Sequence, residues 1–231
     1  MRAAGAGAPG AVLADPARAL VAWALVGGAL VGSALVGCER AERPSPVKCP
    51  ARFAVDEARQ AHIVEKLRGT EEGARTLARW TEPLRICFGP ARPSALTEEG
   101  VLLLDGAADD ARAAARTAHL VAHLADGLPA LVAGKGDCAA RVERALVAEA
   151  AGLGLELRVG RALGAPSLAG GPFEVEAVFW QSPPEAREGA LVAYLRAHPD
   201  GAPGVDALAS GYARRCAAAS TSSGAGPDAA P

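Results

Sequence analysis

Two histidines, His119 and His123, stand four residues apart in the segment HLVAH. On an α-helix, side chains at positions i and i+4 lie on the same face, one turn apart. Two imidazoles placed in this way can bind one zinc ion, which prefers nitrogen, sulfur and oxygen ligands in tetrahedral geometry. The spacing therefore predicts two ligands of a metal site, and a third ligand must come from elsewhere in the chain.

Two glutamates on the following predicted helix are candidates for that third ligand. Counting 100° per residue, Glu149 falls about 20° from Val142 on the apolar face, where a carboxylate is costly to bury without a partner. Glu143 falls about 100° from Val142, towards the side of the helix, where water can solvate it. We therefore expect Glu149 to be the ligand, with Glu143 as the alternative.

The region from about 84 to 164 resembles the gluzincin metallopeptidases, a zincin group with HExxH on one helix and a third ligand, a glutamate, on a later helix. The chain departs from the family at Leu120, where active zincins carry the glutamate that accepts a proton from zinc-bound water. Ala122 also excludes the inverted HxxEH pattern. The resemblance implies a degenerate zincin-like domain that no longer hydrolyses peptides by this mechanism. We expect no cofactor in such a degenerate domain, and zinc is the one that the spacing allows.

Three alternatives stay open at this point. A solvated helix face without metal would carry the same polar stripe, which comprises Arg112, Arg116, His119, His123 and Asp126. A zinc-dependent hydrolase would need a general base from another part of the fold. A helical envelope lipoprotein unrelated to zincins would only present a binding surface.

Apolar periodicity and capping residues predict the elements that position these side chains. The predicted elements are a broken helix or two helices over 55–80, strands at 84–88 and 100–105, the histidine helix over 108–126, a helix over 138–163, a strand or extended segment at 173–180, and helices over 184–198 and 205–216. We expect residues 101–104 to form an edge strand beside an inherited groove. The predicted fold class is α+β and predominantly helical, with a short strand pair followed by a zincin-like pair of helices.

The first 37 residues have the layout of an export signal. Arg2 and Arg18 precede an uncharged apolar run, and the residues LVGC at 35–38 resemble the lipobox of bacterial lipoproteins. The resemblance implies cleavage before Cys38, a lipid on its sulfur, and anchoring in the cell envelope. Glu39 after the lipid site favours the outer membrane, facing the periplasm. An uncleaved anchor is the alternative, because the run is nearly long enough to cross a bilayer.

Four cysteines remain besides the lipidation site: Cys49, Cys87, Cys138 and Cys216. An even number in an exported chain favours two disulfides, and the sequence leaves their pairing open. Buried free thiols are the alternative. No two of these cysteines have the CxxC spacing of a structural zinc site.

The 231 residues carry a net charge of −2, which argues against a nucleic acid bound by bulk electrostatics. Half of the residues are hydrophobic and only 4% are aromatic, which favours a core of close-packed helices. We divide the chain into a signal peptide (1–37), the lipidated cysteine with a tether (38–50), one domain (51–216) and a disordered low-complexity tail (217–231). The expected partners are the membrane, through the lipid, and an envelope protein or peptide.

Overall fold

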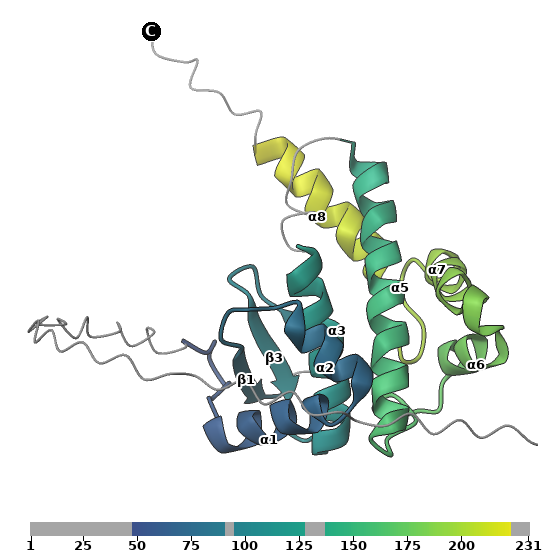
Figure 1. The fold of residues 1–231 in the computed structure, drawn as a ribbon. Coiled ribbons are helices and arrows are strands. Elements are labelled where there is room, and N and C mark those ends of the chain that lie inside the picture. The colour runs from purple at the N-terminus through teal and green to yellow at the C-terminus, as the bar shows by residue number, and fades with distance from the viewer. Residues whose placement is uncertain (1–47, 91–94, 128–136, 223–231) are drawn as a thin grey trace, which may run out of the picture. The chain divides into compact units, whose positions relative to one another are not determined.

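A computed structural model describes residues 48–90, 95–127 and 137–222 (Figure 1). The export signal, Cys38 and most of the tether lie outside these residues. No helix within the described ranges is long and apolar enough to cross a membrane. The fold is α+β and predominantly helical, as predicted. Its elements are α1 (Glu57–Arg68), α2 (Glu71–Ala78), β1 (Arg85–Gly89), β2 (Ala95–Leu96), β3 (Val101–Asp105), α3 (Asp110–Asp126), α5 (Cys138–Ala162), α6 (Glu174–Gln181), the 3₁₀ turn η1 (Pro184–Ala186), α7 (Arg187–Ala197) and α8 (Leu208–Ser222).

One small sheet has the strand order β1-β3-β2. β1 pairs with β3 in parallel, with Arg85 opposite Val101, and β2 pairs with β3 antiparallel, with Ala95 opposite Leu103. Both predicted strands are confirmed. The prediction that 101–104 forms an edge strand is wrong, because the short strand β2 hydrogen-bonds to the free side of β3 and makes it the central strand.

The histidine helix α3 has well-defined ends. The Asp109 side chain accepts a hydrogen bond from the Arg112 N–H at 2.9 Å, which caps the N-terminus. The helix ends at Gly127, whose φ of 68° is a left-handed conformation that glycine adopts without steric cost. His119 and His123 lie between these two ends, four residues apart in one continuous helix, and therefore share a face.

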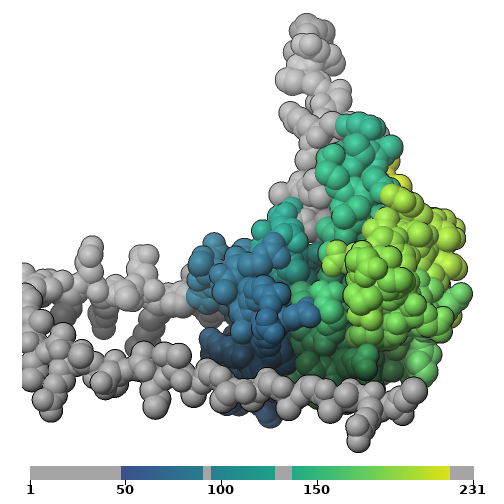
Figure 2. Space-filling view, turned by 45° about the vertical axis from the view of Figure 1, so that its right-hand side comes forward, coloured from purple at the N-terminus to yellow at the C-terminus, as the bar shows by residue number. Residues whose placement is uncertain are grey.

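Two apolar clusters lie on opposite sides of the α3–α5 pair. The first fills the space between α1, the sheet and α3, and the second lies between α5, α6 and α7. Figure 2 shows the sheet-side elements in blue on one side and the α6–α7 elements in yellow-green on the other. Because α3 packs along α5 between these clusters, side chains on their facing surfaces are enclosed even where they are polar.

The C-terminal third includes one wrong prediction. Residues 173–180 were expected to be a strand or extended, but α6 is a helix. The Glu176 carboxylate accepts hydrogen bonds from the backbone N–H groups of Phe173 and Leu168, both at 3.2 Å, and so caps the first turn. The two closing helices are confirmed. α8 continues to Ser222, past the expected domain end at Cys216, and residues 223–231 lie outside the described part.

The four cysteines form two disulfides, as predicted. Cys49 pairs with Cys87, which joins the segment before α1 to β1. Cys138 pairs with Cys216, which joins the first residue of α5 to α8. The structure thereby selects one of the three pairings that the sequence left open.

Candidate metal centre

Three side chains from α3 and α5 converge on one point. Nε2 of His119 lies 2.8 Å from Nε2 of His123, and Oε2 of Glu149 lies 3.2 Å from the first nitrogen and 3.1 Å from the second. Glu143 is not part of this group, because its carboxylate pairs with Arg196 on the exposed side of α5. The ranking of the two glutamates from the sequence therefore agrees with their positions.

All three residues are buried, with exposed fractions of 2% for His119, 3% for His123 and 7% for Glu149. The alternative of a solvated polar stripe is wrong for this part of α3, because α5 covers it. The stripe is open to water only towards its ends, where Arg112 and Asp126 are about two-fifths exposed (41% each).

The triangle of donor atoms fits a small tetrahedral ion. Zinc–ligand bonds of about 2.0–2.1 Å at tetrahedral angles place the ligand atoms about 3.3 Å from one another. The observed separations of 2.8–3.2 Å are slightly shorter, so a small outward movement would accommodate the ion. Two imidazole nitrogens and one carboxylate oxygen are also the ligand set of several zinc sites.

Glu156 on α5 orients the first histidine. Its Oε2 lies 2.8 Å from Nδ1 of His119 and accepts a second hydrogen bond from Nη1 of Arg116 at 3.0 Å. When Nδ1 of His119 donates to this carboxylate, Nε2 keeps the lone pair that a metal requires. Glu156 was not among the residues predicted from the sequence, although a residue seven positions after Glu149 lies on the same face of the helix.

Tyr212 on α8 orients the carboxylate ligand. Its hydroxyl donates to Oε1 of Glu149, which leaves Oε2 facing the two imidazoles. Burial and the neighbouring charge of Glu149 raise the pKa of Tyr212, so its hydroxyl stays protonated and remains a donor. No local pattern in the sequence marks this tyrosine, because its partner is 63 residues away.

Carboxylates predominate among the charged groups around the donor atoms. Burial alone would raise the pKa of Glu149, but hydrogen bonds with His119 and His123 hold it well below its usual range. Burial likewise opposes ionisation of Glu156, but the charge of Arg116 and the His119 hydrogen bond lower its pKa to about 2. Asp206 adds a third carboxylate within electrostatic range. With neutral imidazoles, three carboxylates and one guanidinium leave two negative charges, which a divalent cation would neutralise.

Gly152 on α5 makes room for the first histidine. A Cβ atom at this position would lie 2.5 Å from Cδ2 and 2.7 Å from Nε2 of His119, far inside the normal contact distance. Gly152 and Gly154 both lie in the middle of α5, where glycine has a low helix propensity. The helix is continuous through both, and Gly152 lets the imidazole approach its backbone closely.

Leu120 lies in the apolar cluster on the sheet side of α3, where it is almost fully buried. Residue 120, at which the resemblance to zincins predicted the loss of a proton-accepting glutamate, is thus part of the hydrophobic core. Leucine has no group that accepts a proton, so this position contributes packing and no acid–base chemistry.

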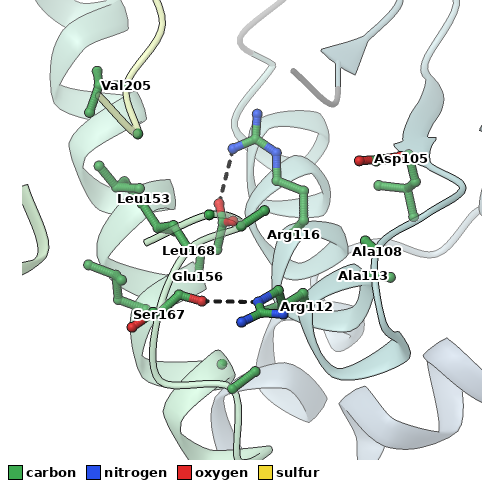
Figure 3. A pocket seen from close by; sticks show the side chains of 18 of the residues that line it. Asp105, Ala108, Arg112, Ala113, Arg116, Leu153, Glu156, Ser167, Leu168 and Val205 are labelled. Carbon is green, nitrogen blue, oxygen red and sulfur yellow. Dashed lines mark hydrogen bonds and ion pairs between the residues drawn. The ribbon is translucent and has the colours of Figure 1, made fainter. Parts of the chain in front are cut away.

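A cavity of about 480 Å³ adjoins the centre, between α3, α5 and the loops at 165–170 and 202–206. Figure 3 shows Arg112 and Arg116 on its α3 wall and Leu153, Leu168 and Val205 on the opposite side. The Arg116–Glu156 ion pair lines this cavity, and the same Glu156 contacts His119. The pair therefore connects the cavity with the donor atoms.

No protein-family model, curated protein or solved structure matches this chain.

Proposed function

We propose that this chain is a lipid-anchored protein of the bacterial cell envelope whose domain binds one zinc ion and works by binding or structural support. The convergence of His119, His123 and Glu149 in a buried, acid-rich site is the observation that carries the metal part. Glu156 and Tyr212 support it, because each holds one ligand in the orientation that leaves a lone pair for the ion.

The zinc ion would be held by Nε2 of both histidines and by Oε2 of Glu149. Bound there, it supplies a positive charge that neutralises the carboxylates and links α3 to α5. Because the unfolded chain has no such site, binding adds to the free energy of unfolding. Leu120 leaves the family's hydrolytic mechanism without its proton acceptor, which favours a binding role over peptide hydrolysis.

The partner would bind in the cavity beside the metal centre. Its volume suits a side chain or small group of an envelope protein or peptide partner, and it combines an apolar wall with charged residues. The partner cannot lie in a groove beside an edge strand at 101–104, since β3 is the central strand of the sheet.

One observation favours the alternative of a hydrolase with a non-standard general base. Asp206 lines the cavity next to Glu156, and burial together with the charges of Glu149 and Glu156 raises the pKa of Asp206 despite the opposing charge of Arg116. A carboxylate with a raised pKa is a better proton acceptor. Chelator-sensitive proteolysis that is lost in Asp206→Asn would establish this alternative and overturn the non-catalytic proposal.

A matched pair of variants tests the metal centre. The purified full chain is stripped with a chelator, dialysed and titrated with zinc by calorimetry, with metal content measured separately. Wild type and Glu143→Gln should each bind one zinc ion, whereas Glu149→Gln should bind it at least tenfold more weakly. Absence of zinc binding by wild type, or equal affinity of the two variants, would refute the assigned ligand set.

The lipid anchor has its own test, since Cys38 lies outside the described residues. Cells expressing wild type with a radiolabelled fatty acid should yield a labelled, membrane-bound protein cleaved before Cys38. The Cys38→Ser variant should be unlabelled and unprocessed. Normal labelling and processing of this variant would rule out the lipobox.

A further inference from the structure

The disulfide between Cys138 and Cys216 contacts a buried arginine. Nη2 of Arg141 lies 3.5 Å from Sγ of Cys138 and 2.5 Å from Sγ of Cys216. Arg141 is only 3% exposed, so its charge acts on these sulfurs with little screening by water. A guanidinium in this position favours the negatively charged form of a sulfur over the neutral one.

The two sulfurs of this disulfide differ in access. Cys138 is partly exposed at the first residue of α5, whereas Cys216 is only 1% exposed. An external thiolate can therefore reach Cys138, and Cys216 becomes the leaving group. Because the leaving thiolate would be stabilised by Arg141, thiol–disulfide exchange should be fast in this direction.

The second disulfide provides an internal comparison. Cys87 is fully buried on β1 between apolar neighbours, and within the described residues no charged side chain donates a hydrogen bond to the sulfur of Cys49 or Cys87. A thiolate leaving at Cys87 would be an uncompensated buried charge. The two disulfides of one chain should thus differ in how readily they open.

The Cys138–Cys216 link also positions a residue of the metal centre. Tyr212 lies one helical turn before Cys216 on α8, which packs along α5 (Figure 1). Tyr212 packs against Ala145 and donates to Glu149 Oε1. Opening the disulfide removes the covalent restraint on α8 beside this contact, and loss of the contact would leave one carboxylate oxygen of Glu149 unsatisfied.

We propose that Cys138–Cys216 is a thiol–disulfide exchange site for a dithiol reductant, and that its reduction weakens the metal centre through Tyr212. The second half of this proposal rests on the proposed zinc binding, and the first half does not. A thiolate of the dithiol attacks Sγ of Cys138, and the electron pair of the breaking S–S bond passes to Sγ of Cys216, next to Arg141. The second thiol then attacks the mixed disulfide and releases Cys138. Two electrons and two protons pass from the dithiol to the cysteine pair, and the dithiol becomes a disulfide.

Partial reduction with dithiothreitol, followed by alkylation and peptide mass analysis, tests the exchange site in the full chain. Cys138–Cys216 should open at least about tenfold faster than Cys49–Cys87. Arg141→Met should remove most of this difference, while Arg141→Lys, which keeps the charge, and Arg144→Met, which changes an exposed arginine on the same helix, should preserve it. Equal opening rates of the two disulfides in wild type, or an unchanged rate in Arg141→Met, would overturn the proposal.

Zinc titration of the same samples tests the link to the metal centre. After selective opening, the thiols are alkylated so that they cannot bind zinc, and the affinity should fall about tenfold or more relative to the oxidised protein. Tyr212→Phe with both disulfides intact should show a similar loss. Unchanged affinity in both samples would refute the link. If the oxidised wild type binds no zinc, the proposed function fails, while the exchange rates still decide the first half of the proposal.

Discussion

The two buried faces of α3 carry opposite chemistry. The face towards the sheet presents Leu120 and Val121 to an apolar cluster, whereas the face towards α5 presents His119 and His123 to Glu149. Apolar side chains are stabilised by burial itself, but a buried polar group is stable only when it has partners. A polar stripe on a helix can therefore be as buried as an apolar one, provided that the neighbouring helix supplies complementary groups.

This contrast predicts different responses to substitution on the two faces. The sheet-side face should tolerate changes that keep volume and polarity, because its contacts are non-directional. The α5-side face should tolerate few substitutions, even those that keep the side-chain volume, because each group there is held by a specific charge or hydrogen bond.

The largest effect is expected where a charge enters the apolar face. Leu120→Glu should lower the free energy of unfolding by about 4 kcal/mol, since it loses the packing of a buried leucine and places a carboxylate among apolar side chains. The conservative Leu120→Met should cost less than about 1.5 kcal/mol. Urea denaturation measures both. We also expect Leu120→Glu to gain no peptidase activity, and a stable, active Leu120→Glu protein would show that position 120 faces the metal.

The second effect comes from neutralising a charge on the polar face. Glu156→Gln should lower the free energy of unfolding by roughly 3 kcal/mol, because Arg116 loses its buried counter-charge. Zinc affinity should fall ten- to a hundredfold, because His119 loses the carboxylate that orients it. Glu143→Gln on the exposed side of α5 is the control and should change neither quantity much. Wild-type zinc affinity in Glu156→Gln would exclude this role.

The third effect arises where the His119 ring contacts the backbone of α5 at Gly152. Gly152→Ala should cost about 2 kcal/mol, because the added methyl group overlaps the His119 ring, and it should also weaken zinc binding. Gly189→Ala on α7 makes the same substitution in another helix, but its added methyl group would meet no atom within 4 Å. This control should be neutral or stabilising by up to about 1 kcal/mol, owing to helix propensity. Similar behaviour of both variants in thermal denaturation would contradict the close packing.

Local signals explain what the sequence could predict. Strands β1 and β3 and helices α3 and α5 follow from periodicity and caps such as Asp109, and Glu149 follows from its position on the apolar face of its own helix. The sequence could not place Tyr212 or pair the cysteines, because these contacts join segments far apart in the chain. The error at 173–180 has a physical cause, since its apolar and aromatic residues favour a strand while the capping carboxylate of Glu176 stabilises a helix.

The smallest predicted effect is the pH dependence of the polar face in metal-free protein. The pKa of Glu156 falls from 4.5 to about 2 on folding, so its stabilisation is present above about pH 4.5 and is lost as the pH falls towards 2. Burial and the charge of Arg116 oppose protonation of His119, but hydrogen bonds with Glu149 and Glu156 raise its pKa above 6.5. Stabilisation by His119 is therefore present below about pH 6.5 and is lost as the pH rises through the folded value. The apolar face contributes no such dependence.

Zinc binding should change this pH dependence of stability, because a histidine must be neutral to bind the metal. Below the raised folded pKa of His119 the ion competes with the proton on its imidazole, whereas above that pKa it occupies a site whose proton is already lost. Zinc should therefore raise the melting temperature more at about pH 8 than at about pH 5.5, by about 3 °C, which corresponds to about 1 kcal/mol for a domain of this size. Thermal denaturation at both pH values, in chelator and in excess zinc, measures the difference, with Glu149→Gln as the control that should show a smaller zinc shift at each pH. An equal zinc shift at both pH values in wild type would mean that the ion does not displace the proton of His119.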